Sequence, residues 1–190
     1  MPGEYRARIT MGSGGGGAAR SFQTLDNGQP PSAESLRSLR RLHAAAVCVV
    51  TTAFPGGLRG VTATAFTVVS LAPPRVLVCL GQGSDALGWV TAAGNFAVNV
   101  LADQQEFLAE RFAGRAPLVN ARFEGVKHQL TARGNPVLVD GLAWFDCAVE
   151  SVHTQGDHVV VFGEVLAGGY GDGDEPLLYY DGAYRFLQTS

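Results

Sequence analysis

The feature that most constrains the fold is a regular alternation of side-chain character over residues 142–152. Alternate positions there are apolar, namely Ala143, Phe145, Cys147 and Val149. The positions between them are Trp144, Asp146, Ala148 and Glu150. A period of two places successive side chains on opposite faces of a β-strand. The pattern therefore predicts a strand that buries its apolar set and turns the second set away from that core.

Turn signals connect this strand to further strands. Gln155-Gly156-Asp157 precedes the apolar run His158–Leu166. Further on, Leu177–Tyr180 and Ala183–Leu187 flank Asp181-Gly182, a dipeptide that favours a two-residue hairpin turn. The C-terminal third is therefore expected to be antiparallel β-structure.

The rest of the chain adds short strands and a few helices. Strands are expected at residues 45–53, 60–74, 75–80, 95–101 and 126–130. Helices are expected at 33–44, with Ser32 as N-cap, at 85–93 and at 104–112. In the last of these, Asp103 and Glu106 are expected to form a capping box. The side chains of Phe107, Leu108 and Phe112 are expected to point inward. About six to eight strands with two or three short helices predict a mainly β fold, a small closed or half-closed antiparallel barrel.

Length and composition limit the class of protein. With 190 residues, one domain is expected over 32–190, preceded by a flexible, glycine-rich tail over 1–31. A formal net charge of −3 disfavours non-specific binding of nucleic acid, which needs a clustered basic surface. No apolar run is long enough to span a membrane, and the N-terminus lacks the layout of a signal peptide. We therefore expect a cytoplasmic protein with no nucleic-acid or membrane partner.

The cysteines Cys48, Cys79 and Cys147 are odd in number, widely spaced and set in apolar surroundings. This pattern indicates free thiols in a reducing compartment, with neither a disulfide framework nor a metal site. The sequence also lacks a Ser/His/Asp order, paired carboxylates or a CxxC motif, so hydrolytic and thiol chemistry are disfavoured.

The stretch Gly60–Pro74 is unusual for a buried strand. Its first part is small or hydroxylated, with Thr62, Ala63, Thr64 and Ala65. The apolar residues expected in the core follow, namely Phe66, Val68, Val69 and Leu71. Pro73-Pro74 then stops regular pairing. A strand with a bare, hydroxyl-lined face leaves room for a flat ligand against its backbone.

A glycine loop, Gly81-Gln82-Gly83-Ser84, opens a predicted helix. Glycines let backbone amides face an anion, and a helix N-terminus offers unpaired N–H groups, so we predict a phosphate site here. The wider pattern Gly81-x-Gly83-x-x-Ala86 formally matches a dinucleotide fingerprint, but the strands and hairpins that follow exclude a Rossmann fold. Asp85 would repel the anion unless its carboxylate caps the helix.

His158 follows Gly156-Asp157 at a tight turn, which places it on the rim of the barrel, where an imidazole could meet a ligand. The other histidines, His43, His128 and His153, have no neighbours at metal-ligand spacing. Three arginines, Arg37, Arg40 and Arg41, crowd one helical segment. They form either a solvated face or a phosphate contact.

Six motifs, taken together and in order, resemble those of one family. They are Gly60–Phe66 with Val69–Pro74, Cys79–Ser84, Phe96–Leu101, Arg111–Gly114, Gly156-Asp157-His158 with Gly163–Val165, and Leu177–Tyr180 with Tyr184. The resemblance is to the flavin reductase family, the NAD(P)H:flavin oxidoreductase components of two-component monooxygenases, whose FMN-binding domain is a split β-barrel. It covers about residues 35–188.

The resemblance implies roles for individual residues. Contacts to the ring and ribityl chain of FMN or FAD fall to Thr62, Ala63, Thr64, Ala65 and Phe66, with Val69 and Ser70 beside them. Contacts to the flavin phosphate fall to Leu80, Gly81, Gln82 and Ser84. His158 is associated with the nicotinamide nucleotide, NADH or NADPH, and Tyr184 with the same cleft. The family often has Ser-x-Thr with a basic middle residue where this chain has Ser84-Asp85-Ala86, which leaves the choice between FMN and FAD open.

The resemblance also implies a homodimer, hydride transfer from nicotinamide to flavin, and a partner monooxygenase that receives reduced flavin. Other interpretations remain open. One is a flavin-binding electron-transfer or sensory protein without reductase turnover. Another is an oxidase like pyridoxamine-phosphate oxidase. Such an enzyme would need a cluster of Arg and Lys to bind the phosphate of its substrate, whereas Lys127 is the sole lysine here. A pure interaction domain would leave the hydroxyl-lined strand and the glycine loop unexplained.

Overall fold

The computed structural model describes residue 28 and residues 30–114 and 123–187. The chain divides into two compact units, residues 1–37 and 38–190. The boundary between them falls within helix α1 (Ala33–Arg41), where Ser32 Oγ accepts a hydrogen bond from the Ser35 N–H at 3.1 Å, as expected for an N-cap. The tail predicted at 1–31 lies almost entirely outside the described residues, so the predicted domain boundary stays a prediction.

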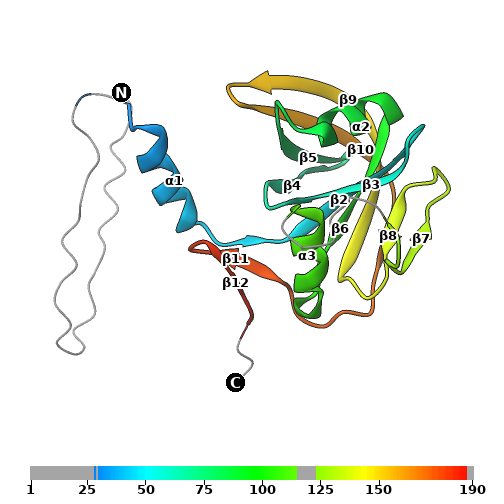
Figure 1. Ribbon diagram of the computed structural model, residues 1–190. Helices are drawn as coiled ribbons and strands as arrows, with labels where there is room; N and C mark the ends of the chain where they lie inside the picture. The colour runs from blue at the N-terminus through cyan, green and yellow to red at the C-terminus, as the bar shows by residue number, and fades with distance from the viewer. Residues whose placement is uncertain (1–27, 29, 115–122, 188–190) are drawn as a thin grey trace. The chain divides into compact units, whose positions relative to one another are not determined.

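The remaining elements form a mainly β structure, as predicted. In chain order they are β1 (Ala45–Ala46), β2 (Cys48–Phe54), β3 (Gly57–Ala63), β4 (Phe66–Leu71), β5 (Pro74–Gly81), α2 (Asp85–Ala93), β6 (Asn95–Val100), a 3₁₀ turn (Asp103–Gln105), α3 (Glu106–Phe112), β7 (His128–Leu130), β8 (Pro136–Leu138), β9 (Ala143–Gln155), β10 (His158–Tyr170), β11 (Leu178–Tyr180) and β12 (Ala183–Arg185). Strands β9 and β10, with 13 residues each, form a long hairpin (Figure 1). No helix among the described residues has the length and apolar character needed to cross a membrane.

The main sheet has seven strands in the order β3-β2-β6-β9-β10-β5-β4, and neighbouring strands are antiparallel throughout. Its edge strands β3 and β4 are joined by only two residues, Thr64 and Ala65. The Cα atoms of Ala63 and Phe66 can then be at most about 11 Å apart, so the two edges meet and the sheet must curl. Within the described residues β3 and β4 do not pair, so the barrel is half-closed. We call this opening the barrel seam.

Two hydrophobic clusters form on the two faces of the curled sheet. One contains Val50, Val78, Phe96 and Cys147, among others. The other lies toward α3 and includes Val49 and Phe112. Val49 and Val50 are adjacent in β2 and therefore point to opposite faces, yet both are fully buried. A strand that is covered on both sides is apolar at successive positions, which explains the run in β2.

The stretch 60–74 differs from the single strand that was predicted. It contains the end of β3, the two-residue link and all of β4. Phe66 does pack against the barrel core, with its ring 5.4 Å from that of Phe145. The prediction that Val68, Val69 and Leu71 lie in the core is wrong, since they are 45%, 48% and 87% exposed. The physical reason is that β4 is an edge strand that pairs only with β5 among the described strands.

The start of α3 also differs from the prediction. Asp103 and Glu106 do not form a capping box; instead the side-chain oxygen of Gln105 accepts a hydrogen bond from the Ala102 N–H at 3.0 Å. The chain enters α3 through a 3₁₀ turn, which moves the helix start to Glu106. Phe107, predicted to point inward, is 65% exposed, whereas Phe112 is buried as predicted.

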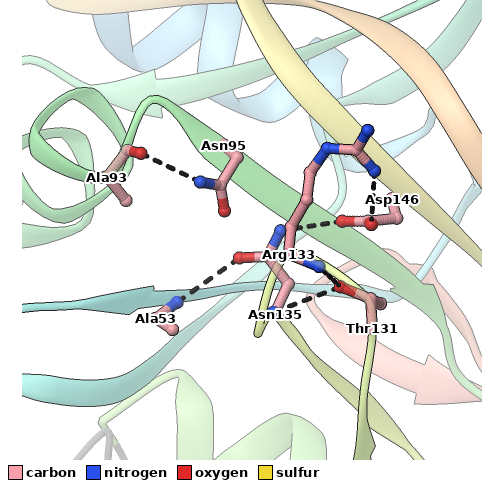
Figure 2. A network of polar contacts seen from close by, with 7 residues as sticks. All are labelled: Ala53, Ala93, Asn95, Thr131, Arg133, Asn135 and Asp146. Carbon is pink, nitrogen blue, oxygen red and sulfur yellow. Dashed lines mark hydrogen bonds and ion pairs between the residues drawn. The ribbon is translucent and has the colours of Figure 1, made fainter.

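Asp146 is the largest departure from the alternation in β9, because it is fully buried on the face predicted to point away from the core. Its carboxylate accepts hydrogen bonds from Asn135 Nδ2 at 2.7 Å and from Arg133 Nη1 at 3.2 Å (Figure 2). Both partners lie in the loop between β7 and β8, and Thr131 Oγ1 accepts from the Asn135 N–H at 3.2 Å. The loop thus covers a polar strand position that local periodicity would leave in water.

Candidate functional site

Two adjoining hollows lie at the barrel seam, each with a volume of about 180 Å³. The first is lined by Arg40, Arg41, His43, Ala45, Thr64, Ala65 and Tyr179. The second is lined by Arg40, Val47, Thr62, Ala63, Thr64, Ala113, Tyr179 and Tyr184. Because Arg40, Thr64 and Tyr179 line both hollows, we treat the two as one seam cavity. The small residues Thr62–Ala65 therefore do border open space, as the sequence indicated.

The bare face of β3 is only partly open, because helix α3 covers its first half. A Cβ atom at Gly60 would lie 2.7 Å from Cδ1 of Phe112, so the ring occupies the space that glycine leaves. Thr62 Oγ1 donates a hydrogen bond to the carbonyl oxygen of Ala109 at 2.6 Å. The hydroxyl of Thr62 thus anchors α3, although Thr62 and Ala63 also border the second hollow.

The hairpin β11–β12 supplies an aromatic wall of the seam cavity. The rings of Tyr179 and Tyr184 meet edge to face at 5.4 Å, and Tyr184 Oη donates to Glu110 Oε1 at 2.7 Å. The predicted turn is confirmed, since Asp181 and Gly182 both have positive φ, 49° and 79°. Arg41 binds this turn by donating to Asp181 Oδ1 at 3.2 Å and to the Asp181 carbonyl at 3.1 Å. The wall is therefore held against the segment that carries Arg40.

The glycine loop begins a helix at Asp85, as predicted, with Ser84 as the N-cap. Ser84 Oγ accepts a hydrogen bond from the Ala86 N–H at 3.2 Å, so Ser84 and not Asp85 caps the helix. Two loop amides are already paired, because Ser84 N–H donates to Gly81 and Gln82 N–H donates to the carbonyl of Asp157. The loop therefore has fewer free donors than the sequence suggested.

Leu80 is 3% exposed and belongs to the barrel core, so its side chain is not available to a ligand on the surface. Val69 and Ser70 lie on β4, where the pairing with β5 shifts register between Val68 and Ser70. They follow Ala65 by four and five residues, or roughly 13–17 Å along an extended chain. They do not line the seam cavity.

His158 lies on the rim, as predicted, and is exposed. It pairs in register with Gly81 of β5, which brings the Gly156–His158 turn beside the glycine loop. Its Nδ1 lies 2.8 Å from Asp157 Oδ1. The structure places Tyr184 in the seam cavity and His158 beside the glycine loop.

The seam cavity and the glycine loop are neighbours along β5. The Cys79 N–H donates a hydrogen bond to the carbonyl oxygen of Ala65 at 3.0 Å. Gly81 follows Cys79 by two residues, which is about 7 Å along a strand. A ligand of nucleotide length could therefore contact Thr64–Ala65 and the glycine loop together.

The cysteines are free thiols. Burial raises the pKa of Cys48 and of Cys147 to about 12, and it also raises the pKa of Cys79. Thiols of this kind stay protonated near neutral pH and are poor nucleophiles. Among the described residues, no group of three or more His, Cys, Asp or Glu side chains is arranged to hold a metal ion.

Sequence reasoning did not find the full wall of the seam cavity. Tyr179 was placed in a strand without a functional role, and Arg40 was left between a solvated face and a phosphate contact. The signal that could have pointed to Tyr179 is the exposed aromatic pattern of a short hairpin. Nothing local in the sequence shows that this hairpin packs beside Thr64.

Comparison with known proteins places this geometry in a family. A family model described as a flavin reductase like domain matches residues 39–188. The FMN reductase (NADH) RutF of Variovorax paradoxus is 37% identical over 171 residues, covering 88% of this chain and 94% of the relative. The reductase subunit HsaB of a flavin-dependent monooxygenase from Rhodococcus jostii is 38% identical over 142 residues, covering 75% of this chain and 71% of the relative.

A solved structure gives the same assignment. The NADH:FAD oxidoreductase SgcE6 of Streptomyces globisporus, in complex with NAD and FAD fragments, has a TM-score of 0.77 and 31% identity, covering 88% of this chain and 98% of that one. The matched residues 39–188 contain the seam cavity, the glycine loop and the rim histidine. The chain therefore belongs to the family of flavin reductase-like domains.

Proposed function

We propose that this protein is a flavin reductase that uses NADH to reduce FMN or FAD and supplies the reduced flavin to a partner monooxygenase. The observation that carries the proposal is the seam cavity, which is lined by small residues at the end of β3, within a flavin reductase-like domain. The hydrogen bond between Cys79 and Ala65 brings β5, and the glycine loop that follows it, close to this cavity. The names of the relatives, an NADH-dependent FMN reductase and a monooxygenase reductase subunit, support it.

The residues of the seam cavity fit a flat ring. Small-molecule sites begin at roughly 300 Å³, and the two hollows of about 180 Å³ each adjoin through shared residues. Ala63 and Ala65 leave the backbone accessible, Tyr179 offers aromatic surface, and the hydroxyl of Thr64 has no partner among the described residues. We therefore assign the flavin ring to Thr62–Phe66.

We assign the phosphate end of the flavin to Gly81–Ser84. The space beside Gly83 is open where a Cβ atom would stand, so an anion can approach the backbone there. Ser84 Oγ accepts from the Ala86 N–H and retains its own hydrogen to donate. The exposed carboxylate of Asp85 opposes this anion. Weak retention suits a reductase whose reduced flavin must leave.

We assign His158 to the nicotinamide nucleotide. Its Nδ1 lies beside Asp157 Oδ1, and Nε2 has no hydrogen-bond partner among the described residues. An imidazole fixed in this way can hold an amide or a ribose hydroxyl through Nε2. It is a binding and orienting group in this assignment, with no proton to transfer.

The chemistry that the two nucleotides supply when bound is the transfer of a hydride from nicotinamide to flavin. The contribution of the chain is position, because a reaction of this kind depends on how closely the reactants are held. The small residues of β3 set how near a ring can lie to the backbone. Cys79, beside Ala65, stays a protonated thiol because its pKa is raised by burial, so it does not compete as a nucleophile.

We further propose a homodimer that covers β4. Val68, Val69 and Leu71 form an exposed apolar surface on an edge strand. Exposed apolar edges promote association, and a second copy would remove them from water. Leu71→Glu is expected to convert the dimer into a monomer in sedimentation velocity, while Thr67→Glu on the same strand, at an exposed polar position, should have less effect. A wild-type monomer at micromolar concentration would contradict the proposal.

The test of the function is a direct assay with purified protein, NADH or NADPH, and FMN or FAD, following the absorbance of the reduced nicotinamide. Flavin-dependent oxidation of NADH is the expected result. No oxidation with any combination would overturn the proposal, and tight flavin binding in that case would favour an electron-transfer or sensory protein. The cytoplasmic location stays a prediction, supported by free thiols at Cys48, Cys79 and Cys147.

A further inference from the structure

Arg40 is the cation that faces both hollows of the seam cavity. Its guanidinium has no hydrogen-bond or ion-pair partner within residues 30–114 and 123–187. An arginine is always charged and carries five N–H donors in a planar fork that matches a phosphate group. A charged guanidinium without a partner beside an open cavity is available to bind an anionic ligand.

The neighbouring charges leave Arg40 as the available one. Arg41 lines the first hollow, but its guanidinium is bound to Asp181 Oδ1 and to the Asp181 carbonyl. Glu110, which accepts a hydrogen bond from Tyr184 Oη, is not among the residues that line either hollow. His43 lines the first hollow and can add positive charge only when it is protonated. The described residues that line the two hollows thus include two arginines and no carboxylate, which favours an anion.

Arg41 also explains how Arg40 is held in place. The N–H of Asp181 donates to the carbonyl of Arg41 at 2.7 Å, and the His43 N–H donates to the carbonyl of Arg40 at 3.1 Å. A Cβ atom at Gly182 would lie 2.9 Å from Nη2 of Arg41, so the glycine makes room for this contact. The backbone that carries Arg40 is thus attached to the hairpin that walls the cavity.

We propose that Arg40 is a second phosphate-recognition residue, which binds a phosphate group of the flavin or of the nicotinamide nucleotide at the seam cavity. The proposal rests on the proposed function, in that the ligand is a nucleotide. For FMN, which has one phosphate, Arg40 is the alternative to the glycine loop, and for the two phosphates of FAD or of the nicotinamide nucleotide it is an addition to it. At the loop two amides are already paired and Asp85 opposes an anion. A charged side chain at the cavity supplies the electrostatic attraction that the loop lacks.

The experiment measures binding without turnover. Titration of FMN and of riboflavin, followed by flavin fluorescence, compares ligands that differ only in the phosphate. The proteins are the wild type, Arg40→Ala, Arg40→Lys and the control Arg37→Ala, which removes the same charge from the same helix without lining the cavity. A second arm compares NADH with reduced nicotinamide riboside, which lacks phosphate. Circular dichroism checks that each variant is folded.

Loss of a charge-assisted contact should lower affinity about tenfold. If Arg40 binds the phosphate of the flavin, Arg40→Ala lowers the preference for FMN over riboflavin by that factor. If Arg40 binds a phosphate of the nicotinamide nucleotide, Arg40→Ala lowers the preference for NADH over the riboside instead. In either case Arg40→Lys recovers part of the loss and Arg37→Ala changes neither preference.

The proposal would be overturned if Arg40→Ala kept both preferences within twofold of the wild type. It would also be overturned if Arg37→Ala lost as much of either preference as Arg40→Ala. Wild-type protein that binds FMN but does not oxidise NADH would refute the proposed function alone, and the flavin arm would still decide the role of Arg40. Protein that binds neither nucleotide would refute both.

Discussion

Replacement of Asp146 by alanine should destabilise the fold more than any other single removal of a carboxylate in β9. The carboxylate is fully buried and accepts hydrogen bonds from Asn135 and Arg133. In Asp146→Ala, the buried Asn135 amide loses its acceptor and the volume of the carboxyl group becomes a void. The β7–β8 loop would then lose its main polar attachment to β9.

The magnitude follows from what each partner can do after the change. A buried donor left without an acceptor costs about 1–3 kcal/mol, and breaking a buried charge pair costs about 3–5 kcal/mol. Arg133 is 35% exposed and can turn to water, so the charge contribution must be reduced. We therefore expect a loss of about 2–4 kcal/mol in the free energy of unfolding for Asp146→Ala. Asp146→Asn keeps an oxygen for Asn135 and should lose only about 1 kcal/mol.

Urea unfolding followed by tryptophan fluorescence measures these free energies. The matched control is Glu150→Ala, on the same strand, which removes an exposed carboxylate paired with Arg75. An exposed pair contributes at most about 1 kcal/mol. In the double variant of Asp146→Ala with Asn135→Ala, the two losses should not add, because both remove the same hydrogen bond.

Two results would refute this reasoning. One is an Asp146→Ala protein as stable as the Glu150→Ala control. The other is a loss of equal size in Asp146→Asn and Asp146→Ala, since the argument assigns most of the cost to the missing acceptor. Additive losses in the double variant would show that Asn135 and Asp146 act independently.

Three further predictions concern the site and the core. His158→Ala should raise the KM for NADH several-fold and leave flavin affinity nearly unchanged. An unchanged KM for NADH in steady-state kinetics would contradict the assignment of His158 to the nicotinamide nucleotide. Gly60→Ala should lower the free energy of unfolding by about 1–3 kcal/mol through overpacking, because the added methyl group would meet Phe112. An unfolding temperature equal to that of the wild type would contradict this prediction. Burial raises the pKa of Cys48 and Cys147 from 9.0 to about 12, so their protons are held more tightly in the folded state. The contribution of these thiols to the free energy of unfolding is therefore fully present below the unfolded pKa. It falls as pH rises toward the folded pKa, by up to about 1.4 kcal/mol per pH unit for each thiol. Urea unfolding across this pH range should show a smaller decrease for Cys48→Ala than for the wild type, because one of the two thiols is absent.

Local patterns predicted the elements of the fold well. Turn residues fix the backbone directly, so Asp181-Gly182 identified a hairpin and Ser84 identified the start of α2. The alternation in β9 correctly identified a strand, because the period of side chains is a property of the strand alone. These features need no knowledge of what lies nearby.

Errors arose where burial depends on distant partners. Val68 and Leu71 were assigned to the core from their apolar character, but the position of β4 at the edge of the sheet leaves them exposed. Asp146 is buried because the β7–β8 loop covers it. Periodicity reports that a strand has two faces and does not report what covers each.

The candidate site was predicted in part. The small residues of β3 and the rim position of His158 follow from the sequence. The other wall of the cavity, with Arg40 and Tyr179, joins segments from opposite ends of the domain. Helix α3 also fills the space beside Gly60, which could not be predicted, since only the packed structure shows where the ring of Phe112 lies.

The strand order has a consequence for synthesis of the chain on the ribosome. The N-terminal half can form β3-β2-β6 and the hairpin β4–β5, but these two pieces share no pairing with each other. They become one sheet only when β9 pairs with β6 and β10 pairs with β5. A nascent chain that ends before residue 143 would hold two β-pieces that do not pair with each other and have unpaired edges, which is the kind of species that chaperones bind. The long hairpin, made among the last elements, therefore decides when the whole barrel can assemble.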